Sequence, residues 1–246
     1  MVRLSVNVNK VATLRNSRGG QVPSVLEAVR VCLDANVPGI TVHPRGDERH
    51  IRRADVRDIA QLLREIAPSV ELNIEGDPRP DWLELVHEVK PAQATLVPVR
   101  EGELTSEAGW READPSAMQR IVAPLRAAGI RVSLFVDPEP TPIEWAKRAG
   151  ADRVELYTEP YARAAEQNRA AALASFERYA AAARFAHGLG LGINAGHDLD
   201  LDNLVLFREL PHLNEVSIGH ALMARALFVG LPQVLQEYLA CLAAIG

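Results

Sequence analysis

The chain alternates short apolar runs with longer segments of helical periodicity, and this alternation limits its fold more than any other feature. The runs are four to seven residues long and rich in valine, isoleucine and leucine. Runs of this kind are typical of strands buried on both faces, as in parallel sheets. We therefore predict strands at Leu4–Val8, Gly39–His43, Val70–Glu75, Ala94–Pro98, Ile130–Val136, Arg153–Tyr157, Leu191–Asn194 and Glu215–Ile218.

Helical patterns occupy the intervals between these strands. The clearest are an amphipathic helix, a helix that opens with a capping box, and an alanine-rich helix that stops at a glycine. They lie at Arg53–Ile66, at Ser24 with Glu27 three residues later, and at Tyr161–His187 with the stop at Gly188. Eight such strand–helix units in 246 residues predict one domain, residues 1–246, folded as a (β/α)8 barrel with extra helices. An open doubly wound sheet is the alternative.

Composition excludes several classes of protein. A chain with 48% hydrophobic residues has enough apolar side chains for a core, so it is not intrinsically disordered. The net charge of −5 argues against sequence-independent binding of nucleic acid, which depends on clustered cations. No apolar run approaches the roughly 20 residues of a membrane span, and the N-terminus lacks a signal-peptide pattern. With Cys32 and Cys241 interpreted as reduced thiols, we expect a soluble cytoplasmic protein.

Polar and ionisable residues recur where the predicted strands end. In a barrel these carboxyl ends meet at one mouth, where catalytic residues collect. A single such residue is more often structural, but six strands showing the same pattern predict an active site. The residues are Asn7 and Asn9, His43, Glu75, Glu155, Asn194 with His197, and Ser217 with His220.

Two predicted loops are long and basic, and a third feature follows the last strands. The loops are Asn9–Gly20 and His43–Arg53, and the second holds four arginines and two histidines in eleven residues. Arginine suits bidentate capture of phosphate. Glycine at the start of a helix, as at Gly219-His220, lets backbone N–H groups approach an anion. The sequence therefore predicts phosphorylated ligands.

The sequence lacks the short motifs that are typical of zinc proteases, nucleotide-binding proteins and serine hydrolases. The chain has no His-Glu-x-x-His, no Walker A sequence, no G-x-G-x-x-G and no Gly-x-Ser-x-Gly. We expect neither a metal nor a nucleotide cofactor. An aldolase or isomerase barrel remains an alternative, but its Schiff-base lysine would belong on a strand, and Lys10, Lys90 and Lys147 fall outside the predicted strands. A non-catalytic phosphate sensor is the alternative from another class.

The motifs taken together resemble the pyridoxine 5′-phosphate synthase family. The matching segments are Val6–Val8, Ala12–Asn16, Gly39–Arg45, Arg49–Ile51, Asn73–Glu75, Leu96–Pro98, Val132–Phe135, Asn194–His197 and Ile218–Ala221. The resemblance implies a homo-octamer of (β/α)8 barrels that needs no metal or organic cofactor. It also implies the condensation of 3-amino-2-oxopropyl phosphate with 1-deoxy-D-xylulose 5-phosphate to pyridoxine 5′-phosphate, phosphate and water.

The resemblance also assigns roles to individual residues. It implies acid–base roles for His43, Glu75 and His197, and charge stabilisation by Glu155. The substrate-binding positions that it implies are Asn7, Arg18, Arg45, His50, Thr105, Asp198, Gly219 and His220. The chain departs from the common family pattern at two places: Asn9-Lys10 stands for an Asp-His pair, and Asp198 stands for a glycine. A substrate contact by Asn9 or Lys10 is therefore in question, whereas Asp198 can still offer its backbone N–H.

Overall fold

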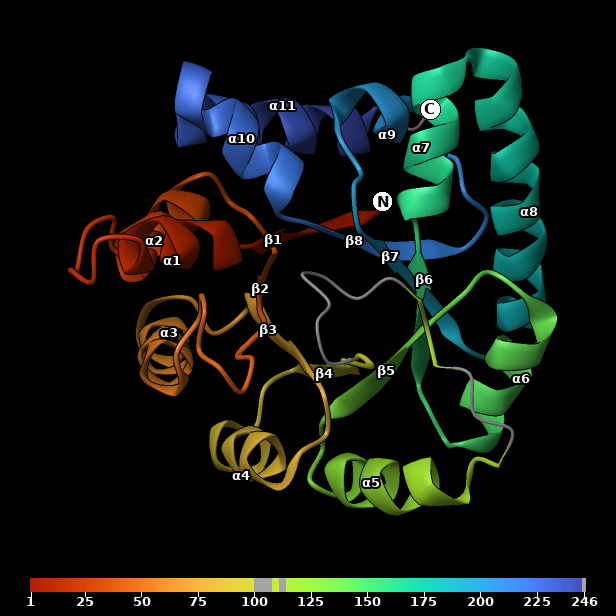
Figure 1. Ribbon diagram of the computed structural model, residues 1–246, viewed down its shortest axis with the longest axis horizontal. Coiled ribbons are helices and arrows are strands. Elements are labelled where there is room, and N and C mark those ends of the chain that lie inside the picture. The colour runs from red at the N-terminus through yellow and green to blue at the C-terminus, as the bar shows by residue number, and fades with distance from the viewer. Residues whose placement is uncertain (100–107, 111–113, 245–246) are drawn as a thin grey trace.

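The computed structural model describes residues 1–99, 108–110 and 114–244 of the chain. Within these residues, eight parallel strands close into a barrel in the order β1 to β8, and helices ring the outside of the barrel (Figure 1). The strands are β1 (Arg3–Asn7), β2 (Gly39–Val42), β3 (Glu71–Gly76), β4 (Gln93–Leu96), β5 (Arg131–Val136), β6 (Arg153–Tyr157), β7 (Gly192–Gly196) and β8 (Leu213–Ile218). The predicted (β/α)8 barrel is confirmed, and the open sheet is wrong because β8 pairs with β1.

The helices of the described chain include the predicted amphipathic one and several that extend the basic barrel pattern. They are α1 (Asn9–Asn16), α2 (Val25–Asp34), α3 (Arg53–Ile66), α4 (Pro80–Val89), α5 (Ser116–Ala127), α6 (Pro140–Arg148), α7 (Glu159–Gln167), α8 (Arg169–Gly188), α9 (Leu201–Phe207), α10 (His220–Val229) and α11 (Leu231–Ala243). The Ser24 hydroxyl accepts a hydrogen bond from the Glu27 N–H at 3.2 Å, so α2 begins where predicted. In the described residues, no helix has the length and apolar character needed to cross a bilayer.

Two expectations about the helices are wrong. Most of the first basic loop is helix α1, which runs through residues that contain neither glycine nor proline. Its last turn is held by tertiary contacts, since the buried Arg15 guanidinium donates to the Asp55 carboxylate of α3 at 2.9 Å. The alanine-rich segment is two helices, α7 and α8. Asn168 interrupts it in an extended conformation, and its side chain caps α8 by accepting from the Ala171 N–H at 2.9 Å.

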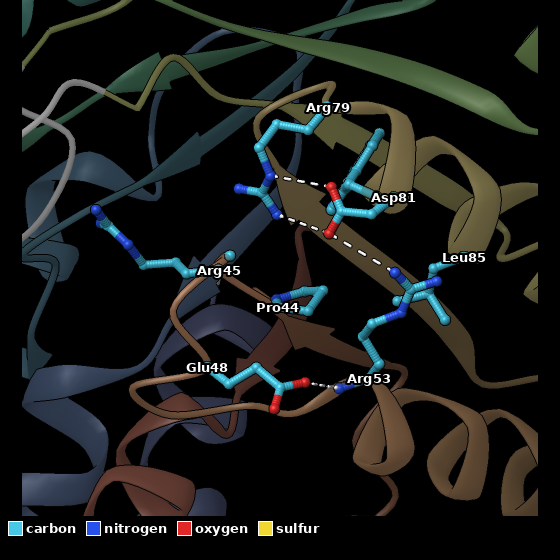
Figure 2. A pocket seen from close by; sticks show the side chains of 9 residues that line it. Pro44, Arg45, Glu48, Arg53, Arg79, Asp81 and Leu85 are labelled. Atoms are coloured by element: carbon cyan, nitrogen blue, oxygen red, sulfur yellow. Dashed lines mark hydrogen bonds and ion pairs between the residues drawn. The ribbon is translucent and has the colours of Figure 1, made fainter.

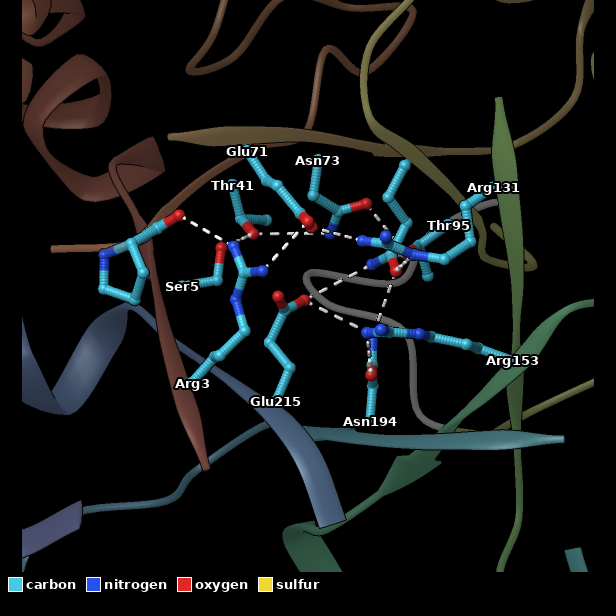
Figure 3. Close-up of polar contacts among 12 residues, drawn as sticks. Arg3, Ser5, Thr41, Glu71, Asn73, Thr95, Arg131, Arg153, Asn194 and Glu215 are labelled. Atoms are coloured by element: carbon cyan, nitrogen blue, oxygen red, sulfur yellow. Dashed lines mark hydrogen bonds and ion pairs between the residues drawn. The ribbon is translucent and has the colours of Figure 1, made fainter. Parts of the chain in front are cut away.

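The two faces of the barrel strands differ in polarity. Outward side chains such as Val6, Ile40 and Ile74 are buried in the apolar layer between strands and helices. The inward side chains are largely polar and form hydrogen-bonded layers (Figure 3), whereas branched apolar residues usually fill such barrels. The interior bonds in the figure join Ser5 to Thr41, Thr41 to Asn73, Asn73 to Thr95, Gln93 and Asn194 to Glu215, and Arg153 to Asn194.

This polar interior fills the barrel below its mouth with side chains that are mostly hydrogen-bonded, although Nε of Arg3 and the hydroxyl of Ser133 have no partner among the described residues. At the amino ends of the strands, Arg3 donates to Glu71 at 2.9 Å, and Arg131 donates to the other oxygen of the same carboxylate. Because buried polar groups are stable only when they are paired, these bonds fix the inward side chains of neighbouring strands. The side chains at the carboxyl ends of the strands therefore lie above layers of hydrogen-bonded side chains that restrict their movement.

Helix α4 lies against the end of β3 at Gly76, where there is no room for a side chain. A Cβ atom at Gly76 would lie 2.1 Å from Nε1 of the buried Trp82, whose N–H donates to the Glu75 carbonyl at 3.0 Å. We expect Gly76→Ala to lower the free energy of unfolding by about 1–3 kcal/mol, the usual cost of overpacking. Urea denaturation measures the change. Gly188→Ala is the control, since a Cβ there meets nothing within 4 Å, and an equal loss in both variants would contradict the prediction.

Candidate active site

The structure brings the predicted acid–base residues to one end of the barrel. Glu75 and Glu155 lie near the carboxyl ends of β3 and β6, while His43 and His197 directly follow β2 and β7. Parallel strands in a closed barrel place these ends at the same mouth. The imidazoles of His43 and His197 are close enough for their charges to interact. These four side chains therefore form one cluster.

The Glu75 carboxyl group is buried and weakly hydrogen-bonded. Its oxygens accept from the Asn7 side-chain amide and from the Ser217 hydroxyl, both at 3.4 Å. Burial raises the pKa of Glu75 from its ordinary value of 4.5 to about 8, the Ser217 hydrogen bond opposes this, and the charge of Glu215 adds to it. Glu75 therefore carries a proton at neutral pH and titrates close to it.

The Glu155 carboxyl group lies against the backbone of β7. A Cβ atom at Gly196 would lie 2.5 Å from Oε1 of Glu155, so the glycine of the Asn-Ala-Gly-His segment makes room for this carboxyl. Burial raises the pKa of Glu155 well above its ordinary value, and the charges of Glu75 and Glu215 raise it further. Burial and these charges therefore favour the protonated carboxylic acid at Glu155.

His197 is held in a backbone conformation that few residues with a side chain adopt. Its φ is 87°, and the following Asp198 has a φ of 57°. The Thr158 hydroxyl donates to the carbonyls of Gly196 and His197, and the imidazole packs on Phe135 with ring centroids 4.9 Å apart. Burial lowers the pKa of His197, although the charge of Asp198 opposes the shift.

His43 faces the interior of the mouth with a neutral imidazole. Its Nε2 atom is hidden from solvent and has no hydrogen-bond partner among the described residues. Burial lowers the pKa of His43 well below 6.5, and the charges of His50, Arg45, His197 and Arg79 lower it further. An unpartnered imidazole nitrogen in a buried site is a candidate proton acceptor.

Burial thus shifts the two carboxyls towards the protonated form and favours the neutral imidazole at both histidines. The pKa of Glu75 is raised to about 8 and that of Glu155 well above its ordinary value, while the pKa values of both imidazoles are lowered. The cluster therefore holds two potential proton donors and two potential proton acceptors in one pocket, as reactions with several proton transfers require.

The second basic loop carries His50 and Arg45 beside this cluster. The imidazole Nδ1 of His50 accepts the Ile51 N–H at 2.9 Å, so a neutral His50 carries its proton on Nε2. Burial lowers the pKa of His50 to about 4, with the charges of Arg45 and Lys10 acting in the same direction. Arg45 is 8% exposed. Helix α1 holds this loop, because the Asn16 amide donates to the His50 carbonyl at 2.8 Å.

Arg18, a predicted ligand residue, makes no contact with this cluster among those that the described residues show. Arg18 lies exposed in the turn that follows α1, where its N–H donates to the Arg15 carbonyl at 3.3 Å. Thr105 lies outside the described residues.

Arg79 is a residue near the site that the sequence analysis did not single out. It borders a small pocket of about 80 Å³, together with Pro44, Arg45 and Asp81 (Figure 2). Its guanidinium donates to Asp81 at 3.1 Å and lies over Gly46, where a Cβ atom would be 3.0 Å from Cζ. Its charge also acts on His43. The available signal was its position in the short connection from β3 to α4, at the same mouth as the other strand ends.

The glycine after β8 precedes a helix, as predicted. The space beside it is occupied by Asn7 of β1. Gly219 is the N-terminal cap residue of α10 and offers no side chain to the first N–H groups of the helix. A Cβ atom at Gly219 would lie 3.0 Å from Cβ of Asn7. Glycine is therefore needed here for the approach of β1 to β8, in addition to any approach of a ligand. His220 is exposed at the first position of the helix.

Potential metal ligands are not grouped in the part of the chain that the structure describes. Within it, no three His, Cys, Asp or Glu side chains are arranged to hold a metal ion. The thiols also lie apart from the site, since Cys32 is in α2 and Cys241 is in α11, and both are free.

A closed (β/α)8 barrel with buried titratable groups at the carboxyl ends of its strands defines a barrel enzyme. Comparison with known proteins agrees and is more specific. The family model of the pyridoxal phosphate biosynthesis protein PdxJ matches residues 4–244. The pyridoxine 5′-phosphate synthase of Porphyromonas gingivalis is 52% identical over 240 residues, which cover 97% of this chain and 98% of the relative. The same enzyme of Leptospira biflexa is 48% identical over 250 residues, which cover 97% and 96%.

The chain therefore belongs to the PdxJ family of pyridoxal phosphate biosynthesis proteins. The activity of this family, synthesis of pyridoxine 5′-phosphate, is the activity of this chain. Solved structures show the fold alone. Phosphoribosyl anthranilate isomerase from Thermus thermophilus is 15% identical with a TM-score of 0.62, and the coverage is 100% of both chains. A 4-hydroxy-2-oxoglutarate aldolase is 16% identical with a TM-score of 0.61 over 97% of this chain and 93% of the aldolase.

The raised pKa of Glu75 predicts a stability that depends on pH. A carboxyl whose pKa is higher in the folded protein than in the unfolded chain stabilises the fold fully only below pH 4.5. About 1.4 kcal/mol is lost for each pH unit between that value and about 8. Glu75→Gln removes this titration, so we expect the variant to gain stability over the wild type as pH rises from 5 to 8.5.

Urea denaturation across this pH range measures the difference between the two proteins. Glu144→Gln, at an exposed carboxyl, is the matched control and should show no such pH-dependent gain. A constant difference between Glu75→Gln and wild type at every pH would show that Glu75 is not buried as a neutral acid.

Proposed function

We propose that this chain condenses 3-amino-2-oxopropyl phosphate with 1-deoxy-D-xylulose 5-phosphate, and that His43, Glu75, His197 and Glu155 perform the chemistry. The observation that carries the proposal is the opposite direction of the pKa shifts in the mouth cluster. Two carboxyls with raised pKa values and two imidazoles with lowered pKa values are buried together, and the charges of Arg45 and Arg79 act on His43.

The steps of this condensation match the groups in the cluster. The amine adds to the ketone of the sugar phosphate, water and phosphate leave, and a carbon–carbon bond closes the pyridine ring. Additions and eliminations of this kind move a proton at each step. Glu75, with a pKa of about 8, can donate a proton to a departing hydroxyl and take one back near neutral pH. His43 and His197, both neutral, can remove protons from the amine and from carbon.

Glu155 has a different proposed role. As a protonated carboxylic acid, it can donate a hydrogen bond to negative charge that develops on a carbonyl oxygen in the transition state. Its neighbour Gly196 has no side chain, and a Cβ there would lie only 2.5 Å from the Glu155 carboxyl oxygen. All these steps are additions, eliminations or proton transfers, so the proposal includes no metal and no organic cofactor.

Two anion anchors are proposed for the two phosphorylated substrates. Arg18, Arg45 and the Nε2–H of His50 would bind the sugar phosphate. The backbone N–H groups at Gly219-His220 and Asp198 would bind the phosphate of the amino ketone. The support is the low exposure of Arg45, the neutral state of His50, and the lack of a side-chain cap at the start of α10. Asn7 and Thr105 complete the proposed ligand set.

The assembly and location of the protein are also proposals. We propose a homo-octamer, which gains support from the exposed apolar end of α10, where Leu227 is 74% and Phe228 88% exposed. We propose a cytoplasmic location, consistent with the two free cysteines. Partners are small phosphorylated molecules, with no nucleic acid or membrane among them.

The described residues argue against the two alternative functions, a Schiff-base aldolase or isomerase and a non-catalytic phosphate sensor. Lys10 lies in α1, Lys147 lies in α6, and Lys90 is the C-cap of α4, so none of the chain's lysines projects from a barrel strand as a Schiff-base residue would. A phosphate sensor needs the anion anchors but has no use for four buried titratable groups.

Direct synthesis tests the proposed function. Purified protein is mixed with both substrates, and pyridoxine 5′-phosphate is detected by its fluorescence and mass, with release of inorganic phosphate measured in parallel. We expect one phosphate for each product molecule. Phosphate release without pyridoxine 5′-phosphate would contradict the proposed reaction.

The acid–base assignment predicts the effect of single substitutions. We expect His43→Asn, His197→Asn and Glu75→Gln each to reduce kcat by roughly 10²–10⁴-fold, because each removes a proton-transfer group. Steady-state kinetics under saturating substrates measure this loss. His187→Asn is the matched control, since His187 lies exposed at the end of α8 and stacks on His212, away from the mouth. A near wild-type kcat in any of the three variants would reject the role of that residue.

The two anchors predict opposite substrate selectivity in two variants. Arg45→Ala should raise KM for the sugar phosphate at least about 10-fold with a much smaller effect on the amino ketone, because a charge-assisted hydrogen bond is worth about 1.5–3 kcal/mol. Gly219→Ala should raise KM chiefly for the amino ketone. Each variant is the control for the other, and equal effects on both substrates would contradict the division into two anchors.

A further inference from the structure

Three hydrogen bonds connect Glu75 to His43 through two asparagines. The Asn7 side-chain amide donates to Oε2 of Glu75 at 3.4 Å. The Asn7 side-chain oxygen accepts the backbone N–H of Asn9 at 3.0 Å, and the Asn9 side-chain oxygen accepts the backbone N–H of His43 at 2.9 Å. The path therefore crosses from β3 to the end of β2 through the last residue of β1 and the first residue of α1.

The Asn9 side chain replaces a bond that the sheet cannot make. The ladder between β1 and β2 continues to the bond from the Val8 N–H to the Thr41 carbonyl, at 3.2 Å. In a regular parallel ladder, the Val8 carbonyl would next accept the N–H of His43. That carbonyl instead accepts the Val11 N–H at 3.1 Å as the chain turns into α1. The His43 N–H would lose its partner at this point, and Asn9 supplies one.

Asn9 also determines how the Asn7 amide is oriented. Its backbone N–H requires the oxygen of the Asn7 side chain, so the NH₂ group of Asn7 faces the Glu75 carboxyl. One residue thus acts on two proposed acid–base groups, on His43 through the backbone and on Glu75 through Asn7. Asn9 itself is half-buried at the first position of α1.

We propose that Asn9 is a positioning residue that holds His43 and Glu75 in place through a hydrogen-bond acceptor at its side chain, and that its role in the reaction does not depend on contact with substrate. The inference rests on the acid–base roles proposed above for those two residues. It also explains why asparagine serves at Asn9, because the function needs an acceptor oxygen and not a titratable group. An aspartate at this position would supply the same acceptor.

The test compares three variants with wild type. Asn9→Ala removes the acceptor, Asn9→Asp keeps it, and Thr13→Ala alters an exposed residue one turn along α1 whose hydroxyl donates to the Asn9 carbonyl at 3.1 Å. We expect Asn9→Ala to reduce kcat about 10- to 100-fold, as small displacements of catalytic groups do, with KM for both substrates within about threefold of wild type. Thr13→Ala should behave as wild type.

The Asn9→Asp variant separates positioning from a merely structural role. We expect it to recover most of the kcat that Asn9→Ala loses. The added negative charge favours the protonated imidazole at His43, so the acidic limb of the pH–rate profile should move to higher pH, which the alanine variant does not show. Amide hydrogen exchange gives a readout without substrate: the His43 N–H should exchange faster in Asn9→Ala than in Asn9→Asp.

The outcomes distinguish this inference from the proposed function. Unchanged kcat in Asn9→Ala, or a rise in KM for the sugar phosphate alone, would overturn the positioning role while leaving synthesis intact. An equal loss in Thr13→Ala would assign the effect to the stability of α1 and also overturn it. A wild-type protein that forms no pyridoxine 5′-phosphate would instead overturn the proposed function, and hydrogen exchange at His43 would still test whether Asn9 holds that backbone.

Discussion

Burial of ionisable side chains inside a closed parallel barrel is the constraint on which the rest of this structure depends. Transfer of a charge from water into a protein interior is costly unless the charge is paired or neutralised. The two ends of this barrel meet the cost in different ways. At the amino ends, burial would raise the pKa of Glu71, but the hydrogen bond and charge of Arg131, together with Arg3, outweigh burial and lower it. At the carboxyl ends, Glu75 and Glu155 keep their protons instead.

The same residue type is therefore structural at one end of the barrel and suited to chemistry at the other. Glu71 lies in a closed network of arginines that ties β1, β3 and β5 together. Glu75, four residues later on the same strand and the same face, has only two contacts at 3.4 Å. A weakly bonded carboxyl with a pKa near neutral can exchange its proton with a substrate, whereas a carboxylate held by two guanidinium groups cannot do so readily.

Backbone conformation at the mouth explains how this chain accommodates its departures from the common family pattern. Asp198 stands where many members carry glycine, and its φ of 57° lies in the left-handed region. Aspartate enters this region more readily than most residues with a side chain, so the turn after His197 is preserved. Its charge also acts on the His197 imidazole, in the direction that raises the pKa. At Asn9, an amide takes over the hydrogen bond that the turn into α1 removes from the sheet.

Local patterns were sufficient for the barrel and for the position of most candidate residues. Apolar runs of four to seven residues between helical segments predicted all eight strands, because a parallel barrel repeats one local unit. Polar residues at the strand ends predicted that His43, Glu75, Glu155 and His197 meet at one mouth, since the carboxyl ends of parallel strands share an edge. Helix boundaries were harder to predict from the sequence, because some depend on distant contacts. The last turn of α1, for example, is held by the pairing of Arg15 with Asp55, forty residues away.

Protonation states and supporting contacts were decided only by the tertiary structure. Nothing in the residue type of Glu75 indicates a pKa near 8, and nothing in that of His43 indicates a pKa well below 6.5. These shifts follow from how deeply each is buried and from which charges lie nearby, including Arg79 at the N-cap of α4 and Glu215 on β8. The bond from His43 to Asn9 likewise joins residues 34 positions apart. A linear pattern records which groups are present, whereas desolvation and hydrogen bonding depend on the three-dimensional neighbours that folding provides.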